Sequence, residues 1–359
     1  MTKIDSALAG AAMLAMTAAA GTSAAPAGET LAVPERKWPK AFSESGNIPV
    51  NQATPVINYS PLTFDIPGRP VPLEVKVSMP AVGKDLPVIV MSHGHGAPNY
   101  LSSYRGNAPL VDFFAAHGFI VIQPTHLDAT YLGLREEKLP DAPLYWYDLV
   151  ADVRHVLDKL ADIEAAVPGL AGRMDKQRIG AVGHSLGGST VSQLIGMKIS
   201  DPDDPREKDL SDPRVKAAVI IGAVGIADEH LTKWVRERYR MSNFVDYSDM
   251  TGTALVIAGD KDLNPMFSDR LSYRWDAFTK SPGGNKTLLT FFGADHMYGG
   301  ITGYDAKEVT EENPELVATL RAMVWSYLRS QLYSGDNAWD VAQKALLGAE
   351  NPLGKIETK

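Results

Sequence analysis

The sequence predicts an α/β protein in which helices cover both faces of a mostly parallel sheet. Short, fully apolar runs alternate along the chain with longer segments whose apolar residues recur at helical spacing. Such runs are typical of strands buried on both faces, and their alternation with helices is typical of parallel sheets. The chain has 359 residues, of which 45% are hydrophobic, so we expect one large domain with a substantial core.

Seven segments are predicted as strands. The first, LEVKVSM (73–79), alternates between apolar and polar side chains, as a half-buried strand does. The others are short apolar runs bounded by turn residues, and we expect them at the centre of the sheet. They are PVIVM (87–91), FIVIQ (119–123), RIGAV (178–182), AAVII (217–221), ALVIA (254–258) and LLTFF (288–292).

Helices are predicted between these strands. In the last of them along the chain, Leu316, Leu320 and Val324 recur every four residues and mark one apolar face. The acidic, Pro-rich residues 200–213 break the alternation and are interpreted as a surface loop. Residues 227–250 also break it, and they are interpreted as either a lid-like insertion or loop decoration. The predicted helices are 110–117, 145–165, 189–197 and 314–332.

The two ends of the chain differ from the predicted domain, which spans residues 63–335. Residues 1–27 place Lys3 before an Ala-rich apolar stretch that small residues follow, which is the layout of a secretory signal peptide. This layout predicts export to the periplasm or the outside of a bacterium, the alternative being an Ala-rich leader without that role. Residues 28–62 are predicted as an irregular arm, and residues 336–359 as a C-terminal tail.

Charge and cysteine content exclude several classes of function. The net charge is −8 and no long run of Lys or Arg occurs, so a nucleic-acid partner is not expected. No stretch after the leader approaches the ~20 apolar residues of a transmembrane helix. The sequence contains no cysteine, which excludes disulfides, cysteine-ligated zinc and thiol catalysis.

A glycine-rich turn, VGHSLGGS (182–189), carries the candidate nucleophile. Ser185 follows a predicted strand and precedes a predicted helix, which places it at the carboxyl edge of the sheet, where α/β proteins bind ligands. Gly183 and Gly187 complete the G-x-S-x-G pattern of a nucleophile elbow, a turn too tight for larger side chains at those positions. The alternative is a Gly-rich turn in which the serine is incidental.

Two downstream segments supply partners for the serine in the order acid, then histidine, that this arrangement requires. His296 follows the last strand in GADHMYGG, and it is the candidate base. Asp262 follows the strand before it in GDKDLNP and is the favoured acid, with Asp260 as the alternative. His230 lies in a charged helical stretch and is interpreted as a surface residue. Ser185, Asp262 and His296 are therefore predicted as a catalytic triad.

The loop SHGHGAPNY, directly after the strand at 87–91, is the candidate second half of an oxyanion hole. Gly94 and Gly96 allow the backbone to approach a substrate, so the N–H groups of His95 and Leu186 are the predicted donors. His93 and His95 also have a spacing that two metal ligands could use, but no third ligand lies nearby, so neither a metal nor another cofactor is expected. His93 is expected to hydrogen-bond within the loop.

Aromatic and apolar residues near these loops are candidates for the substrate pocket. Tyr131 lies between the strand at 119–123 and the next helix, and Trp146 lies at the start of that helix. Met297 and Tyr298 directly follow the candidate base. They could line an apolar acyl or alcohol pocket, and the alternative is that they belong to the core.

Five motifs, taken together, resemble those of the α/β-hydrolase family. They are SHGHGA, AAHGFIVIQPTHLD, GHSLGG, IAGDKD and GADH. Within it, they resemble the group of platelet-activating-factor acetylhydrolases, predicted dienelactone hydrolases and chlorophyllases. The resemblance covers about residues 63–332 and implies an α/β-hydrolase fold with an eight-stranded sheet. It also implies Ser185, Asp262 and His296 as the triad, with His95 and Leu186 as oxyanion donors. Small dienelactone hydrolases use a cysteine nucleophile, which this chain lacks.

The motifs and the resemblance predict a serine carboxylic-ester hydrolase that works through an acyl-enzyme. The expected substrate is a small-molecule or lipid-like ester with a short-to-medium acyl chain. An amidase or peptidase would use the same triad, so it remains an alternative. A non-catalytic binding protein of the same fold is the other alternative. A dehalogenase is disfavoured because it would carry aspartate in place of Ser185.

Overall fold

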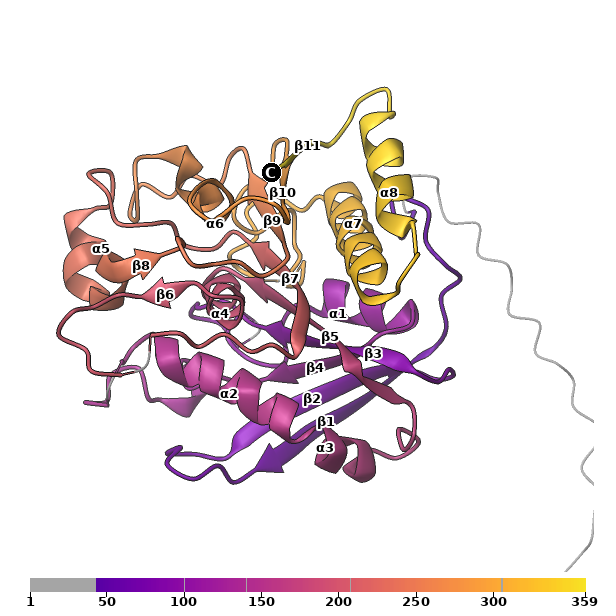
Figure 1. The fold of residues 1–359 in the computed structure, drawn as a ribbon, viewed down its shortest axis with the longest axis horizontal. Helices are drawn as coiled ribbons and strands as arrows, with labels where there is room; N and C mark the ends of the chain where they lie inside the picture. Colours follow the sequence, from indigo (N-terminus) through magenta and orange to yellow (C-terminus); the bar gives the residue numbers. More distant parts are fainter. Residues whose placement is uncertain (1–42, 100, 140, 207, 305) are drawn as a thin grey trace, which may run out of the picture. The chain divides into compact units, whose positions relative to one another are not determined.

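Nine strands form one sheet in the computed structural model, which describes residues 43–359 apart from 100, 140, 207 and 305. Their order across the sheet is β1-β2-β4-β3-β5-β7-β9-β10-β11 (Figure 1). The six strands from β4 to β10 are parallel, whereas β1, β2 and β11 pair antiparallel. The strands are β1 (Val56–Phe64), β2 (Leu73–Pro80), β3 (Leu86–Ser92), β4 (Ile120–Pro124), β5 (Met174–His184), β7 (Val215–Ile221), β9 (Ala254–Gly259), β10 (Lys286–Phe291) and β11 (Gly354–Thr358).

Helices cover both faces of the sheet, and each face has its own core. Along β3, Val88 and Val90 point into one core, and Ile89 and Met91 point into the other. Both sets of side chains are buried, which is why the middle of such a strand is apolar on both faces. The first core packs against α2 (Trp146–Asp158), α3 (Leu160–Ala166) and α4 (Leu186–Leu194), and the second against α1 (Ala108–Ala116), α7 (Pro314–Leu332) and α8 (Ala338–Leu347).

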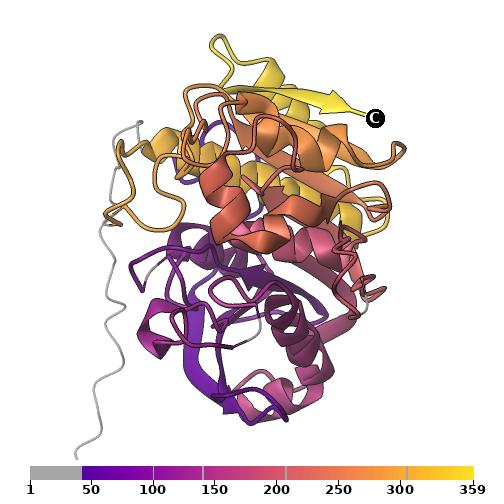
Figure 2. The same ribbon diagram turned by 90° about the vertical axis from the view of Figure 1, so that its left-hand side faces the viewer.

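The structure departs from the sequence-based expectation at the two edges of the sheet. β1 begins at Val56, inside the segment predicted as an irregular arm, and the predicted tail contains α8 and β11. The sheet therefore has nine strands and not the eight implied by the resemblance. Figure 2 shows β11 in yellow beside the C-terminus, at one edge of the sheet. Edge strands carry many exposed and polar side chains, so the apolar pattern that reveals a central strand is missing from them.

Helix positions differ in detail. The helix predicted at 145–165 is divided at Lys159 into α2 and α3. The helix after the serine turn begins at Leu186, three residues earlier than predicted. The predicted signal peptide, and the part of the arm up to residue 42, lie outside the described residues.

Residues 227–250, which we term the cap segment, contain α5 (Lys233–Arg238), the short 3-10 helix η3 (Arg240–Phe244) and β8 (Val245–Asp246). β8 pairs antiparallel with β6 (Lys198–Ile199), which directly precedes the acidic loop at 200–213. Within the parts of the chain that the structure describes, no helix has both the length and the apolar character needed to cross a bilayer.

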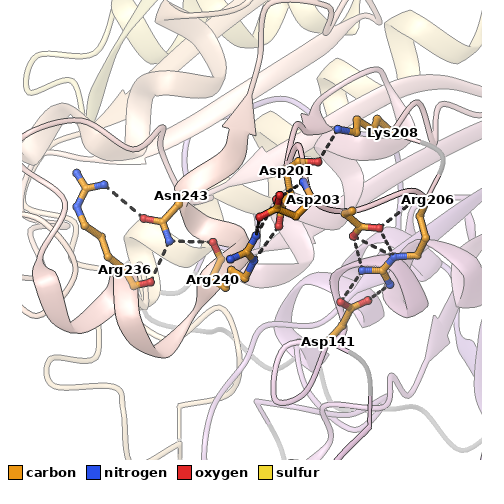
Figure 3. Close-up of polar contacts among 9 residues, drawn as sticks. Asp141, Asp201, Asp203, Arg206, Lys208, Arg236, Arg240 and Asn243 are labelled. Atoms are coloured by element: carbon orange, nitrogen blue, oxygen red, sulfur yellow. Dashed lines mark hydrogen bonds and ion pairs between the residues drawn. The ribbon is translucent and has the colours of Figure 1, made fainter.

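Ion pairs join the acidic loop to the cap segment (Figure 3). Arg240 donates to carboxylate oxygens of Asp201 at 2.8 Å and of Asp203 at 3.0 Å. From the same loop, Arg206 donates to Asp141, which lies just ahead of α2, at 2.8 Å. Residues 200–213 thus form a loop, as predicted. Its charged side chains bind both the cap segment and Asp141, in the segment that precedes α2.

Candidate active site

Ser185 occupies a sharp turn between β5 and α4. Its backbone has φ 55° and ψ −119°, a conformation with positive φ that side-chain-bearing residues seldom adopt. The Ser185 N–H donates to the carbonyl of Ile221 on the neighbouring strand β7 at 2.8 Å. A serine held with positive φ between a strand and a helix is the geometry of a nucleophile elbow.

The two glycines of the G-x-S-x-G pattern are required by close backbone contacts. A Cβ atom on Gly183 would lie 2.0 Å from the carbonyl oxygen of Gly187. A Cβ atom on Gly187 would lie 2.2 Å from the carbonyl oxygen of Ser92. Any side chain at these positions would therefore push α4 away from the ends of β5 and β3, and the turn would open.

The structure brings the three predicted triad residues together. The Oγ atom of Ser185 lies 3.0 Å from Nε2 of His296, and Nδ1 of His296 lies 2.8 Å from Oδ2 of Asp262. Asp262 follows β9 and His296 follows β10, so all three side chains come from loops at the carboxyl edge of the sheet. With a proton on Nδ1 donated to Asp262, Nε2 is free to accept the Ser185 hydroxyl proton.

The other candidates for these roles lie elsewhere. A carboxylate oxygen of Asp260 accepts a hydrogen bond from the N–H of Gly293 at 2.6 Å, which fixes the turn after β10. His230 is bonded to Asp269 at 2.7 Å on the protein surface. The geometry therefore selects Asp262 over Asp260, and His296 over His230.

A buried arginine that the sequence analysis did not identify completes the surroundings of Asp262. The Asp262 side chain is buried, and its Oδ1 atom accepts a hydrogen bond from Nε of Arg274 at 3.2 Å. Arg274 also donates to the carbonyl oxygen of Gly222 at 3.1 Å. Burial alone would raise the pKa of Asp262, but the charges of His296 and Arg274 outweigh it and lower the pKa below its ordinary value. Asp262 is therefore held as a carboxylate.

His184, next to the serine, holds the backbone of His296. Its Nε2 atom lies 2.8 Å from the carbonyl oxygen of His296, and the two rings are 4.9 Å apart. Burial, with a smaller contribution from the neighbouring His296, lowers the pKa of His184 to about 3. The His184 ring is consequently neutral and donates from Nε2 to that carbonyl.

His93 is committed to two hydrogen bonds inside the protein, one within the SHGHG loop, as expected, and one to the N–H of His126 outside it. Its Nδ1 atom lies 3.0 Å from the carbonyl oxygen of Gly94, and its Nε2 atom accepts from the N–H of His126 at 3.0 Å. Burial lowers the pKa of His93 to about 4, so the ring is neutral. Both ring nitrogens are occupied, which leaves neither for a metal ion. Among the described residues, no group of three or more His, Cys, Asp or Glu side chains is arranged to hold a metal.

A second, fully buried Ser-His-Asp array supports the base of the same loop. His126 lies 2.9 Å from the Ser92 hydroxyl through Nε2 and 3.1 Å from Asp152 through Nδ1. Arg69 donates to the other oxygen of Asp152 at 2.8 Å. Ser92 and His126 are each 0% exposed, so no substrate can reach this serine. The array instead fixes the end of β3, where the SHGHG loop begins.

A cavity of ≈150 Å³ opens above Ser185 and His296. Trp146 lines it, as the sequence predicts, and so do His95 and Leu186, the two proposed oxyanion donors. Most of the lining was not identified from the sequence, including Tyr239 and Ser242 of the cap segment, which places that segment over the candidate active site. The remaining lining residues are Leu144, Val224, Asn264, Phe267 and Arg274.

Three predicted pocket residues do not line this cavity. Tyr131 is 40% exposed, and its hydroxyl donates to Glu74 on β2. Met297 and Tyr298 are buried, and the Tyr298 hydroxyl donates to the carbonyl oxygen of Ile257 at 3.3 Å. The prediction of a substrate contact is therefore corrected for all three. For Met297 and Tyr298, the turn after His296 directs the following side chains into the core.

Comparison with protein families bears on this site directly. A model described as the alpha/beta hydrolase family matches residues 89–352. The chain belongs to the alpha/beta hydrolase family. The matched region begins in β3, extends past α8 and includes all three residues of the predicted triad. Membership of this family indicates that the protein is a hydrolase. No curated protein matches the chain. The narrower resemblance to the platelet-activating-factor acetylhydrolase group stays a prediction.

Proposed function

We propose that this alpha/beta hydrolase is a serine carboxylic-ester hydrolase that works through an acyl-enzyme. The observation that carries the proposal is the hydrogen-bonded series from Ser185 through His296 to Asp262, at 3.0 and 2.8 Å, beside a cavity that admits a substrate. These distances lie within the reach that a base needs to take the proton of a serine hydroxyl.

In the acylation step, Nε2 of His296 takes the hydroxyl proton as Oγ of Ser185 bonds to the ester carbonyl carbon. The carbonyl oxygen becomes an oxyanion, to which the backbone N–H groups of Leu186 and His95 donate hydrogen bonds. Asp262 accepts the Nδ1 hydrogen and stabilises the imidazolium that has formed. When the tetrahedral intermediate collapses, the bond from carbon to the alcohol oxygen breaks, and the proton on Nε2 passes to that oxygen.

Water completes the cycle. His296 takes a proton from a water molecule, whose oxygen attacks the acyl carbon bound to Ser185. Collapse of the second intermediate returns the proton from Nε2 to Oγ and releases the carboxylic acid. The free enzyme is thereby restored, and no cofactor takes part in either step.

The cavity lining favours a short-to-medium acyl group or a lipid-like ester. Leu144, Trp146, Val224 and Phe267 provide apolar surface beside Ser185. A cavity of ≈150 Å³ accommodates a group about the size of benzene. We therefore expect p-nitrophenyl acetate and p-nitrophenyl butyrate to be hydrolysed faster than a long-chain ester.

The decisive experiment is labelling with a fluorophosphonate probe combined with ester hydrolysis. The wild type should be labelled and should hydrolyse p-nitrophenyl butyrate, and Ser185→Ala should do neither while keeping its thermal unfolding midpoint. A wild type that is not labelled and not active would overturn the proposal in favour of a binding protein. A matched ester and amide of the same acyl group separate an esterase from an amidase or peptidase, and we expect the ester to be preferred.

We also propose that the protein is exported, on the basis of the signal-peptide layout of residues 1–27. Expression of the full chain in a bacterium, followed by cell fractionation and N-terminal sequencing, tests this. Export predicts a product in the periplasm or medium with a new N-terminus near residues 24–27. An unprocessed chain retained in the cytoplasm would contradict it.

A further inference from the structure

A second histidine–aspartate pair faces the cavity. Nδ1 of His95 lies 2.8 Å from Oδ2 of Asp128, and His95 lines the cavity together with Ser185 and His296. Asp128 belongs to THLD (125–128), the segment that directly follows β4. The side chains of this pair have no part in the reaction steps proposed above. In those steps, His95 contributes only its backbone N–H, which donates a hydrogen bond to the oxyanion.

Asp128 is in a position to orient the His95 ring. The Asp128 side chain is 0% exposed. Burial alone would raise its pKa, but the hydrogen bond from His95 and the neighbouring His93 and His126 rings outweigh burial and lower the pKa. An ionised carboxylate can only accept a hydrogen bond, so Nδ1 of His95 carries the hydrogen. In the neutral imidazole, the second ring nitrogen, Nε2, is then an acceptor.

Arg135 strengthens this arrangement from outside the cavity. Its Nη2 group donates to the carbonyl oxygen of Gly96 at 2.7 Å and lies 3.9 Å from Oδ2 of Asp128. The SHGHG loop and the THLD segment are thereby joined on both sides of His95. The ring is held by its surroundings before any substrate arrives.

His95 differs from the other histidines of these two segments in the use of its nitrogens. Both ring nitrogens of His93 and of His126 are hydrogen-bonded within the protein, and both residues are buried. The His95 side chain is 23% exposed, and among the described residues its Nε2 atom has no hydrogen-bond partner. In the part of the chain that the structure describes, Nε2 of His95 is thus an acceptor without a partner, in a ring of fixed tautomer, at the wall of a largely apolar cavity.

We propose that Nε2 of His95 is a specificity-determining group that accepts a hydrogen bond from a hydroxyl of the substrate, close to the ester bond. This inference rests on the proposed esterase function and names its substrate class, which is hydroxylated esters. A substrate without the hydroxyl leaves the acceptor desolvated and unpaired, and sites with such acceptors reject it. The hydroxyl can lie on the alcohol or on the acyl side, because the same residue contributes its N–H to the oxyanion hole between them.

The test uses two pairs of esters in which a hydroxyl replaces a methyl group of similar size. On the alcohol side the pair is 2-hydroxyethyl butanoate and propyl butanoate. On the acyl side it is ethyl 3-hydroxybutanoate and ethyl 3-methylbutanoate. For each pair, the selectivity is the ratio of kcat/KM for the hydroxylated ester to kcat/KM for the methyl ester. This ratio cancels losses that affect both esters equally, such as partial unfolding or a disturbed oxyanion hole.

In one of the two pairs, His95→Leu should lower the selectivity about five- to tenfold, the size expected for one neutral hydrogen bond. His95→Gln, whose carboxamide oxygen can accept in place of Nε2, should recover part of the loss. Asp128→Asn, which removes the charge that orients the ring, should lie between the wild type and His95→Leu. His230→Leu, the same change at a surface histidine that is also paired with an aspartate, serves as the control and should leave both ratios within about twofold.

The inference is overturned if His95→Leu lowers both members of each pair by the same factor, because His95 would then act only on the loop. It is also overturned if His95→Gln behaves like His95→Leu. Failure of the proposed function would look different. In that case the wild type would hydrolyse none of the four esters, whereas turnover with unchanged selectivity would contradict the His95 inference alone.

Discussion

Arg274 and His296 bind opposite oxygens of one buried carboxylate. Arg274 donates to Oδ1 of Asp262 at 3.2 Å, while Nδ1 of His296 lies 2.8 Å from Oδ2. The arginine is itself buried and is further bonded to the backbone after β7. Asp262 is therefore held by a buried cation on one side and by the proposed catalytic base on the other. Loss of the cation should affect the chemistry and not only the fold.

We expect Arg274→Gln to move the acid limb of the kcat/KM profile to higher pH. The positive charge of Arg274 lowers the pKa of Asp262, so its removal raises that pKa, and the carboxylate is lost earlier as the pH falls. Activity at pH 5 should fall more than activity at pH 8, measured with p-nitrophenyl butyrate. Arg321→Gln, which changes a partly buried arginine away from the site, should leave the shape of the profile unchanged. A uniform loss at all pH values would contradict this role.

Asp262→Asn should reduce kcat far more than Asp260→Asn. The carboxamide cannot stabilise the imidazolium and favours the wrong tautomer of His296, and the corresponding change in a serine protease costs about 10⁴-fold. Asp260 contacts the N–H of Gly293 and not the base, so its substitution should cost less than about tenfold. Steady-state kinetics on both variants, together with their thermal unfolding midpoints, makes the comparison. Equal losses would show that Asp262 is not the orienting acid.

Gly187→Ala should destabilise the protein even though Gly187 lies in a helix. Alanine is favoured over glycine in helices by about 1 kcal/mol. Here its Cβ would lie 2.2 Å from the carbonyl oxygen of Ser92, and overpacking of this kind costs about 1–3 kcal/mol or more. We expect a lower midpoint of thermal unfolding and weaker labelling by the fluorophosphonate. Gly283→Ala is the matched control, because its nearest contact would be at 3.7 Å, and a control variant with the same loss would contradict the steric argument.

The free energy of unfolding should fall as the pH drops from about 6.5 toward 4, in part because of two buried histidines. Burial lowers the pKa of His93 to about 4 and that of His184 to about 3, whereas an unfolded histidine titrates near 6.5. Between these values the unfolded chain binds more protons than the folded chain, so acid favours unfolding. Urea unfolding at pH 7.5 and 5 should show a smaller loss for His93→Gln than for the wild type. Parallel losses would rule out His93 as a contributor.

Arg240→Ala should weaken substrate binding more than it slows the chemical step. Arg240 ties the cap segment to Asp201 and Asp203, and Tyr239 and Ser242 beside it line the cavity. A looser cap segment should raise KM for p-nitrophenyl butyrate about two- to fivefold and leave kcat within about twofold. Lys233→Ala, which removes an exposed cation of α5 that pairs with Glu237 on the same helix, is the control. An unchanged KM in Arg240→Ala would show that this ion pair does not support the substrate pocket.

The central sheet was predictable because burial on both faces imposes an apolar side chain at every position of a strand. The run ALVIA (254–258), for example, is found as β9 (Ala254–Gly259). β1 and β11 were not predicted, because an edge strand exposes most of its side chains and does not need an apolar run. α8 lies in the predicted tail, and its signal is short, with Trp339, Ala342 and Leu346 as its buried residues.

The candidate triad was predictable for a related reason. Each of its residues directly follows a recognisable strand, and the carboxyl ends of parallel strands meet at one edge of the sheet. Arg274 and Ser242 lie in short 3-10 helices and Tyr239 directly precedes one, and only tertiary packing decides where their side chains lie. Met297 and Tyr298 illustrate the converse, since they directly follow the candidate base in the sequence, but neither lines the cavity.

β11 has a consequence for the solution behaviour of the protein. Five residues near the C-terminus pair with β10, the strand whose end carries His296. Without them, β10 would present a row of unpaired N–H and C=O groups, a surface on which strands of other molecules can assemble. The edge strand that covers β10 has the polar sequence GKIET, in which Lys355 and Glu357 are exposed. This edge of the sheet therefore carries charged side chains and not an apolar surface. We therefore expect β11 to protect β10, the strand that precedes His296, against pairing with strands of other molecules.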